Sequence, residues 1–417
     1  MASLLMLTPQ IPYPPRQGTA LRNWGLLRGL AEHHEVSLLT FASADQDTKP
    51  EPTLLERVTR IGIVPQPQRS LRDRLRDFLF TGHPDLTQRL TNEAFSERLN
   101  AWLRDYAFDW IVIEGLEMAP FVVPYRGLGR IAEATRDEPV ARSPRIAFDD
   151  HNCEYLLQKR AARSDWAHFQ WLDPRRLVRA FYSSIQWRRL RAYEAHVCRQ
   201  ADQVVAVSEA DAEALGAIVP DLTPLVIPNG IDVEAYATYE EAADLTQPAF
   251  VFTGTMDFRP NVDGVLWFCD QVWPEIRRVH TSAHFYIVGR NPHPRLDRLR
   301  AIPGVEITGS VPDTRPYIRG AAVYVVPLLV GGGTRLKLLE STAMGKAIVA
   351  TRLAAEGFED PGHAMVLVNT ATAFADACIA LARDPIAREK WGRRARVFAE
   401  TYDWKALLSP LIDRLSD

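Results

Sequence analysis

The sequence predicts an α/β protein made of two Rossmann-like domains, each with a doubly wound, mostly parallel sheet. Three observations lead to this fold class. The chain has 417 residues, which is more than one hydrophobic core normally serves. Short runs rich in Val and Ile alternate with longer segments of helical period, as in successive β–α–β units. These alternations form two series, and a polar segment separates them.

Apolar runs of strand length define the order of the two series. Those of the first series lie at 3–8, 35–41, 110–114, 145–148, 203–207 and 225–227. Those of the second series lie at 249–253, 284–288, 305–308, 323–326, 347–350 and 365–368. Between them, the turn signal Pro228-Asn229-Gly230 and a Glu-rich stretch at 234–247 mark a linker. We therefore expect a first domain over 1–225 and a second over 226–395.

Composition and charge exclude several classes of function. The net charge of −3 gives no general basic field, so no nucleic-acid partner is expected. The four cysteines are far apart and form no C-x-x-C pair, which indicates reduced, buried thiols. The first apolar run lacks the basic start and cleavage site of a signal peptide, and no run reaches the ~18 apolar residues of a membrane span. These features predict a cytoplasmic protein.

The segment 174–200 combines seven arginines and one glutamate with interleaved aromatic and aliphatic residues. This pattern predicts a basic amphipathic helix. One interpretation is a helix packed in the domain with a solvated basic face. The other is a peripheral contact with an anionic membrane surface, or attraction of a phosphate-bearing acceptor. Both interpretations stay open from the sequence.

A Gly-rich segment at 327–345 is the most informative part of the chain. Three consecutive glycines, 331–333, follow an apolar strand and precede a helix that Thr334 is able to cap. Glycines let a ligand approach the backbone, and the start of a helix offers free N–H groups to phosphates. Arg335 and Lys337 add cations there, against the helix dipole unless an anion binds. Lys337 and Glu340 are also spaced to form a simple ion pair.

Two other loops that follow predicted strands have a similar character. Gly18, after a Pro-rich loop that contains Arg16, precedes a helix expected to begin near Ala20. Gly254 follows the strand at 249–253, with Arg259 five residues later beside another helix start. Ligands of doubly wound sheets bind beyond the carboxyl ends of the strands, so these positions are candidates for anion binding. Ordinary surface charge is the alternative interpretation of both arginines.

Polar residues follow two more strands of the first series. Asp150-His151-Asn152 comes after the strand expected to end at 148, and Glu114 ends the strand at 110–114. A histidine beside carboxylates is suited to substrate contact or proton transfer, although such clusters also form turns. The one Asp-x-Asp pair, Asp45 and Asp47, lies in a polar loop that makes a poor metal site. We predict no metal and no organic cofactor.

In this order and spacing the motifs resemble the retaining, metal-independent GT-B glycosyltransferases of family four, also called glycosyl transferases group 1. The resemblance extends over nearly the whole chain. It looks particularly like the bacterial sugar transferases of exopolysaccharide and cell-surface glycan pathways. The segments that carry it are Gly18, Asp150-His151-Asn152, Val207-Ser208-Glu209, Pro228-Asn229-Gly230-Ile231-Asp232, Gly254-Thr255-Met256, Ile287-Val288-Gly289 and the Gly-rich loop that ends in the helix of Glu340.

The resemblance implies transfer of a sugar, with retention, from a nucleotide-sugar donor to a hydroxyl of a glycan, a lipid-linked saccharide or a small molecule. Arg259, with Lys337 or Arg335, would neutralise the donor diphosphate, and Glu340 would bind the ribose hydroxyls. His151 would lie near the reacting sugar. The remaining donor-side residues implied by the family are Gly18, Gly254, Gly332, Gly333 and Thr334, and the acceptor-side candidates are Arg16, Glu114, Asp150 and Asn152.

One position departs from the family pattern. The usual Glu-x7-Glu motif would begin at Gly332, so its first carboxylate, which normally contacts the donor sugar, is absent. This departure keeps two alternatives open, namely a nucleotide-sugar 2-epimerase of the same fold and a catalytically inactive binding subunit. The resemblance also implies that 396–417 crosses back to the first domain. The first domain would then bind the acceptor and the second the donor, across a cleft.

Overall fold

The computed structural model describes residues 1–15, 18–43, 49–125, 143–167, 174–330 and 335–416. The chain divides into two units. One comprises Met1–Pro228 together with Leu408–Asp417, and the other comprises Asn229–Leu407. The first division follows Pro228, close to the predicted boundary at 225/226. The second division falls inside the last helix, α16 (Trp404–Ser416), and not at 395/396.

The sheet of the first unit has seven parallel strands in the order β3-β2-β1-β4-β5-β6-β7. The sequence predicted six of them and missed the edge strand β3, whose side chains are mostly half-buried or exposed and so produce no apolar run. The strands are β1 (Ser3–Thr8), β2 (Glu35–Ala42), β3 (Arg60–Pro65), β4 (Trp110–Glu114), β5 (Arg145–Asp150), β6 (Gln203–Ala206) and β7 (Leu225–Val226).

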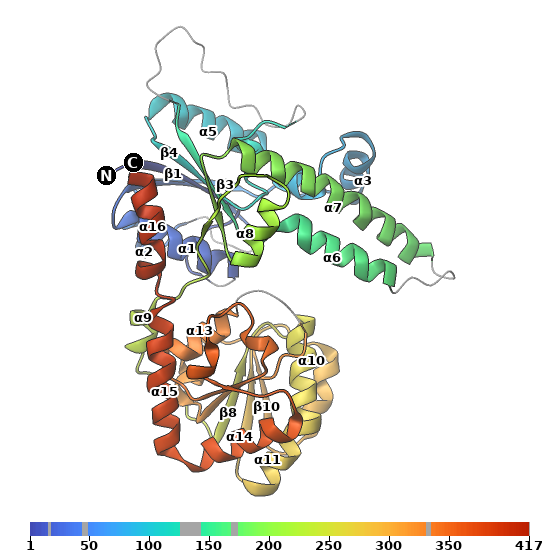
Figure 1. Cartoon of the computed structure of the whole chain (residues 1–417), viewed down its shortest axis with the longest axis vertical. Helices are drawn as coiled ribbons and strands as arrows, with labels where there is room; N and C mark the ends of the chain where they lie inside the picture. Colours follow the sequence, from blue (N-terminus) through green and yellow to red (C-terminus); the bar gives the residue numbers. More distant parts are fainter. Residues whose placement is uncertain (16–17, 44–48, 126–142, 168–173, 331–334, 417) are drawn as a thin grey trace. The chain divides into compact units, whose positions relative to one another are not determined.

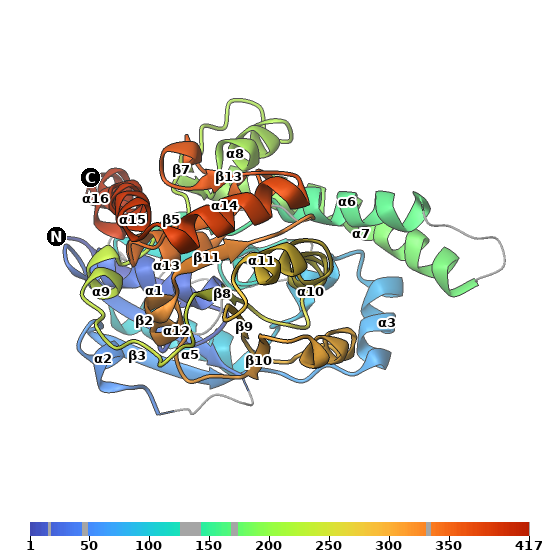
Figure 2. The same cartoon turned by 90° about the horizontal axis from the view of Figure 1, so that it is seen from below.

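Helices connect these strands and cover the sheet (Figure 1). The first begins at Gly18, two residues before the predicted start near Ala20, a difference within the usual variation of helix ends. The helices are α1 (Gly18–Ala31), α2 (Pro52–Leu55), α3 (Leu71–Phe80), α4 (Asp85–Gln88), α5 (Glu93–Asp105), α6 (Glu154–Ala167), α7 (Pro174–Gln200) and α8 (Glu209–Gly216). The predicted helix at 174–200 is thus present as α7, and it runs beside α6 (Figures 1 and 2).

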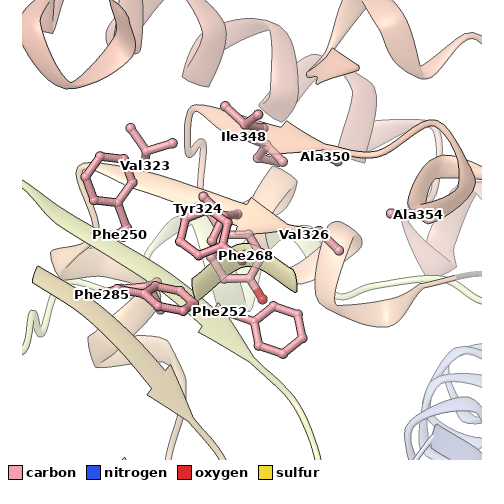
Figure 3. Packing of buried hydrophobic residues seen from close by; sticks show 14 of the residues in the cluster. Phe250, Phe252, Phe268, Phe285, Val323, Tyr324, Val326, Ile348, Ala350 and Ala354 are labelled. Carbon is pink, nitrogen blue, oxygen red and sulfur yellow. The ribbon is translucent and has the colours of Figure 1, made fainter. Parts of the chain in front are cut away.

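The sheet of the second unit has six parallel strands in the order β10-β9-β8-β11-β12-β13. All six were predicted, and β8, β9 and β11 have the predicted bounds. The strands are β8 (Ala249–Thr253), β9 (His284–Val288), β10 (Val305–Gly309), β11 (Val323–Val326), β12 (Ile348–Ala350) and β13 (Val366–Leu367). Aromatic rings of β8, β9 and β11, among them Phe250, Phe285 and Tyr324, pack with Phe268 in the core (Figure 3).

The helices of the second unit flank the strands of both halves of its sheet along the chain. They are α9 (Val233–Ala237), α10 (Arg259–Trp267), α11 (Trp273–Val279), α12 (Arg315–Gly320), α13 (Leu336–Ala343), α14 (Ala371–Arg383) and α15 (Pro385–Glu400). The chain enters each sheet at a central strand, builds outward to one edge, and then returns to build toward the other edge. This order places helices on both faces of each sheet, as the right-handed crossover rule requires.

Strand β5 is longer than predicted, and this changes how its last residues are placed. It continues to Asp150 because Glu114 pairs with Asp149 on one side and Ala206 with Asp150 on the other. Consecutive residues of a strand point to opposite faces of the sheet. Asp149 and Asp150, expected in a loop, therefore face different surroundings.

The cysteines and the helices agree with two predictions from composition. Cys153, Cys198, Cys269 and Cys378 are all buried and none forms a disulfide. Among the helices in the described part of the chain, none is both long and apolar enough to cross a membrane.

Candidate functional site

Each sheet has one topological switch point, where the chain connections after two neighbouring parallel strands run toward opposite edges of the sheet. In the first sheet it lies between β1 and β4, and in the second between β8 and β11. Ligands of doubly wound sheets bind beyond the carboxyl ends of the strands at these points. The residues singled out from the sequence gather at both points, in one group in each unit.

The group in the first unit is a buried set of charged side chains at the ends of β4 and β5. Arg22, from α1, binds Asp149 with two hydrogen bonds of 2.7 Å and 2.5 Å, and it also donates to the carbonyl of Ile227. The Nε2 atom of His151 lies 3.0 Å from Glu114 Oε2 and 3.3 Å from Asp149 Oδ2. The structure therefore brings together two predicted residues, His151 and Glu114, around a charge pair that the sequence did not indicate.

Asn23 joins this group from the next position on α1. When its amide nitrogen is oriented toward acceptors, it lies 3.0 Å from Glu114 Oε2 and 3.2 Å from the carbonyl oxygen of Thr19. Gly18 begins the same helix, so α1 carries both the predicted glycine and the two residues that hold the charged group. Arg16, the predicted acceptor-side arginine, lies outside the described residues.

The His151 side chain is held in its protonated form. Burial lowers the pKa of His151, but hydrogen bonds and charge attraction from Asp149 and Glu114 outweigh it and raise the pKa to about 10. Both carboxylates contact Nε2, and Nδ1 has no hydrogen-bond partner within the described residues. An imidazolium in this position is a hydrogen-bond donor and a positive charge, and it is not available as a base at neutral pH.

The two carboxylates of the group differ in protonation. Burial and the charge of Asp149 raise the pKa of Glu114 to about 7. Asp149 is also buried, but the Arg22 guanidinium holds its pKa well below the usual range. Glu114, Asp149 and His151 offer ligand atoms within 4.8 Å of one another, a spacing that a metal ion also accepts. Arg22 and protonated His151 already balance the charge of these carboxylates.

Asp150 and Asn152, the other two acceptor-side candidates, lie in different environments. Asp150 is 1% exposed and faces Glu194 of α7, away from Arg22. Burial and the neighbouring Glu194 raise the pKa of Asp150 well above its usual value. Glu194 accepts hydrogen bonds from the backbone N–H groups of Glu154 and Tyr155 and so caps α6. Asn152 is exposed in the turn between β5 and α6.

The group in the second unit begins at the glycine turns that follow β8 and β9. A Cβ atom on Gly254, whose φ is +155°, would lie 2.8 Å from Lys337 Nζ and 2.7 Å from Asn261 Nδ2. A Cβ on Gly289 would collide with the carbonyl oxygen of Gly254. These two turns are packed so closely that only glycine fits, and the space they leave is taken by the end of Lys337.

Lys337, one of the two cations predicted at this helix start, is half-buried. Its Nζ donates to Asn261 Oδ1 at 2.8 Å and lies 4.1 Å from the centre of the Phe252 ring. Burial lowers the pKa of Lys337 to about 7, although the charge of Glu340 opposes the shift. An amine with this pKa gains a proton readily when an anion binds beside it.

Glu340 lies one turn further along α13. It accepts a hydrogen bond of 3.1 Å from the hydroxyl of Tyr236 in α9, and burial raises its pKa to about 7. Among the described residues, no ion pair of 4.0 Å or less joins Lys337 to Glu340, so the simple ion-pair interpretation is wrong. The two side chains bind different partners, and both keep a capacity for further hydrogen bonds.

The other predicted cations are less constrained. Arg259 begins α10, its side chain is 84% exposed, and its Nε lies 3.2 Å from Asp263. Arg335 occupies the N-cap position of α13, which was expected at Thr334, and burial lowers its pKa. Gly332, Gly333 and Thr334 lie outside the described residues, as do Asp45 and Asp47.

Several residues of these groups were missed from the sequence. Arg22 and Asn23 stand on one turn of α1, and no spacing rule ties them to residues more than 90 positions away. Tyr236 lies 104 positions from Glu340 and Asn261 lies 76 from Lys337. For Asn261 a signal existed, because it follows Gly254 in a loop already selected. Arg22 was visible as a cation in the first turns of a helix that follows a strand.

Two family models match the chain. Residues 17–235 match the model of Glycosyltransferase Family 4, and residues 247–384 match that of Glycosyl transferases group 1. The first match contains the group around His151 and the second contains the group around Lys337.

Curated relatives match over part of their length. Phosphatidyl-myo-inositol mannosyltransferase of Mycobacterium leprae is 27% identical over 201 residues, which is 45% of this chain and 51% of that protein. An uncharacterized 44.6 kDa protein in the cps region of Klebsiella pneumoniae is 21% identical over 217 residues, 50% of this chain and 54% of that protein. The chain thus aligns with about half the length of these relatives.

Solved structures share the fold over both chains. Sucrose-phosphate synthase of Thermosynechococcus elongatus has a TM-score of 0.64 at 16% identity and is covered over 99% of each chain. HepE of Anabaena, crystallised with UDP, has a TM-score of 0.63 at 13% identity with the same coverage. The two parallel sheets match the fold of these two-domain GT-B proteins. Since a family model also matches more than half of its length, the chain belongs to Glycosyltransferase Family 4.

Proposed function

We propose that this protein transfers a sugar from a nucleotide-sugar donor to a hydroxyl acceptor, with retention of configuration and without a metal ion. The observation that carries the proposal is the half-buried pair of unlike groups on α13, Lys337 and Glu340. Lys337 and Glu340 both have a pKa of about 7, and each has a partner that leaves hydrogen-bonding capacity free. A cation beside a glycine turn suits a diphosphate, and a carboxylate one turn away suits the hydroxyls of a ribose.

The chemistry asked of this site is stabilisation of a departing nucleoside diphosphate. As the bond from the sugar to the diphosphate breaks, negative charge grows on the leaving oxygen. Fixed positive charge lowers the energy of that state most effectively when it is already in position and shielded from water. Protonated Lys337 supplies such a charge, with Arg335 at the start of the same helix and Arg259 at the start of α10 as further cations.

We assign His151 the role of a donor to the sugar. Its Nδ1 has no partner among the described residues, and its pKa of about 10 keeps the ring protonated. A protonated ring cannot deprotonate the acceptor hydroxyl, which agrees with a mechanism in which an oxygen of the donor phosphate takes that proton. Retention follows from this proposal, because the acceptor then attacks from the face that the leaving group vacates.

The names of the relatives favour an acceptor in cell-surface glycan synthesis. One relative is a mannosyltransferase for phosphatidyl-myo-inositol, and another is encoded in a cps region. HepE was crystallised with UDP-glucose, which supports a nucleotide-sugar donor here. We therefore propose a saccharide or lipid-linked acceptor for this chain.

The test is nucleotide binding followed by product analysis. Calorimetric titration of the full chain with nucleoside diphosphates, in the presence of EDTA, should show binding of at least one of them. Lys337→Met and Glu340→Gln should weaken that binding, whereas Lys390→Met and Glu306→Gln, at exposed positions of the same unit, should not. Absence of binding for every nucleotide would contradict the proposal.

Product analysis separates the alternatives. With donor and acceptor present, NMR of the product should show the anomeric configuration of the donor. Conversion of the donor alone into a second nucleotide sugar would instead identify a 2-epimerase. Nucleotide binding without turnover of any acceptor would favour a binding subunit.

A further inference from the structure

The first unit contains a polar pocket of about 510 Å³ that lies outside the group around His151. Its walls come from the loop after β3 and from α3, α4, α6 and α7. Glu154, which lines it, is the first residue of α6 and stands three positions after His151. The pocket therefore lies on the carboxyl-end side of the sheet, where ligands of such folds bind.

The pocket wall carries three arginines. Arg69 pairs with Asp77 at 2.9 Å and with Asp85 at 3.2 Å, and Arg74 pairs with Asp85 at 2.9 Å. Arg89 forms no ion pair within the described residues and is exposed. The second acid of the wall, Glu154, has a pKa raised to about 7 by burial, so part of its negative charge is absent at neutral pH. Arg69 and Arg74 are thus matched by Asp77 and Asp85, and Arg89 is the cation of the wall that is left to attract an anionic ligand.

The pocket also contains a buried amide with an unused donor. Gln186 is 4% exposed, and its Oε1 accepts a hydrogen bond of 2.9 Å from the backbone N–H of Asp85. Its Nε2 has no partner among the described residues. An unsatisfied buried donor is unfavourable, and an oxygen atom of a bound ligand would satisfy it.

Exposed apolar side chains border this pocket. Helix α3 exposes Leu75, Leu79 and Phe80, the last at 80%, and α7 exposes Val178 and Phe181. These five side chains form what we call the apolar rim. The two helices are joined by the Phe78 and Tyr182 rings, whose centres are 4.9 Å apart. Arg74 and Tyr182, neighbours in sequence of Leu75 and Phe181, line the pocket, so the rim and the pocket adjoin.

The basic residues of α7 contribute less to this surface than the sequence suggested. Arg189 donates to the carbonyl oxygens of His83 and Phe78, and Arg199 donates to that of Ile218. These two arginines stabilise the unit internally. The surface suited to an amphiphile is instead the joint surface of α3 and α7 around the pocket.

We propose that the pocket binds the phosphate of a lipid-linked acceptor whose apolar part, and the surrounding bilayer, contact the apolar rim. The inference rests on the proposed function, because it makes this pocket the acceptor subsite. Arginines recognise phosphate with several hydrogen bonds, and exposed Leu and Phe side chains beside cations are typical of surfaces that bind anionic membranes. The charge of His151 acts on Glu154 of the pocket wall, so the pocket lies near the group around His151 within one unit.

Vesicle flotation of the full chain tests the proposal without a donor. Wild type should bind vesicles of phosphatidylcholine with phosphatidic acid, at low salt, and should bind phosphatidylcholine alone weakly. Phe80→Ser and Leu79→Ser should weaken binding roughly tenfold each, because each removes an apolar side chain from the membrane contact. Ile386→Ser removes a side chain of similar exposure in the second unit, and it should bind like wild type.

Pocket variants and a soluble phosphate distinguish the source of the anion. Arg89→Gln should weaken vesicle binding roughly fivefold, and Arg89→Lys should restore most of it. Glycerol phosphate in solution should bind far more weakly than the vesicles do. The lipid assignment is overturned by two results together. Wild type would bind glycerol phosphate as tightly as vesicles, and the rim variants would bind both ligands as wild type does.

Failure of wild type to bind anionic vesicles, or binding unchanged by both rim and pocket variants, would also overturn the inference. Nucleotide titration of the same preparations keeps this result separate from the proposed function. Nucleotide binding without vesicle binding refutes the acceptor inference alone, and vesicle binding without nucleotide binding refutes the proposed sugar transfer.

Discussion

The pKa values of Lys337 and His151 are shifted in opposite directions, because different neighbours surround the two side chains. Burial lowers the pKa of Lys337 to about 7, because Glu340 is the one carboxylate among the described residues that opposes the shift. His151 lies between two carboxylates, so its pKa rises to about 10. Burial acts on both side chains in the same sense, and the number of nearby carboxylates decides the outcome.

Nucleotide affinity should therefore depend on pH through Lys337. Above about pH 7 the free protein must take up a proton at Lys337 to bind a diphosphate, so affinity should fall by up to roughly tenfold per pH unit. Lys337→Met should bind more weakly at neutral pH and should lose this dependence. Titration calorimetry between about pH 6.5 and 9 measures both effects. A wild-type affinity that stays constant over this range would show that Lys337 is not the titrating cation.

His151 should stabilise the folded first unit at neutral pH and lose that contribution in alkali. Its pKa is raised on folding, from about 6.5 to about 10, so its contribution is complete below about pH 6.5 and disappears as the pH passes about 10. The difference in free energy of unfolding between wild type and His151→Gln should shrink over this window. Urea denaturation at several pH values measures it, and a difference independent of pH would contradict the assignment of a protonated ring.

The ion pair of Arg22 and Asp149 should be essential for the stability of the first unit. Arg22→Met leaves a buried carboxylate without its partner, which typically costs about 3–5 kcal/mol. The double variant Arg22→Met/Asp149→Asn removes the unpaired charge and should recover part of that loss. Denaturant titration of the three proteins gives the coupling. A double variant less stable than Arg22→Met would refute this explanation.

At the scale of elements, the turns after β8 and β9 determine where Lys337 can lie. The backbone at Gly289 approaches Gly254 so closely that a methyl group would overlap a carbonyl oxygen. The two loops are also tied by the hydrogen bond from Gly254 N–H to the carbonyl of Val288. The donor-side group thus depends on strand ends that are packed against each other.

Gly289→Ala should consequently destabilise the second unit by about 2–4 kcal/mol, since the new methyl group forces the backbone apart at a positive φ. Gly362→Ala is the matched control, because a Cβ at Gly362 meets nothing within 4 Å. Its effect should stay within about 0.5 kcal/mol. Thermal denaturation with and without a nucleoside diphosphate distinguishes the two variants, and equal effects would show that the turns tolerate a side chain.

At the scale of the whole chain, its last ten residues belong to the first unit although the preceding segment belongs to the second. Leu408, Leu411 and Leu415 are buried, and Leu408 packs directly against Gly29 of α1. The end of the chain is therefore part of the core of the first unit, although the rest of that unit is formed by Met1–Pro228. The family resemblance implied a crossing over 396–417, whereas the segment assigned to the first unit begins at Leu408.

Leu408→Ala should accordingly lower the stability of the first unit by about 2–4 kcal/mol and leave the second unit unchanged. Calorimetry resolves the unfolding transitions of the two units if a nucleoside diphosphate, bound by the second unit, raises the Tm of that unit alone, as ligand linkage requires. Lys405→Ala, exposed and three residues earlier, is the control and should change neither transition. Loss of stability in the second unit alone would contradict the division of α16.

Local patterns in the sequence were sufficient to define the order of the elements, the two parallel sheets and the candidate residues at the strand ends. Buried parallel strands are continuous apolar runs, and anion sites use glycine turns at helix starts, so both can be recognised within a short segment. The Gly-rich loop, Lys337 and Glu340 could be selected in this way from the sequence alone. The edge strand β3 escaped because half-exposed residues leave no apolar run.

The surroundings of each of these residues are set by the tertiary structure. The pairing of Arg22 with Asp149, of Asn261 with Lys337 and of Tyr236 with Glu340 joins segments far apart in the chain. The opposite orientations of Asp149 and Asp150 depend on how far β5 remains paired with its neighbours. Protonation follows from burial and from the charges within a few ångströms. These distances are a property of the packed chain, and no pattern of neighbouring residues contains them.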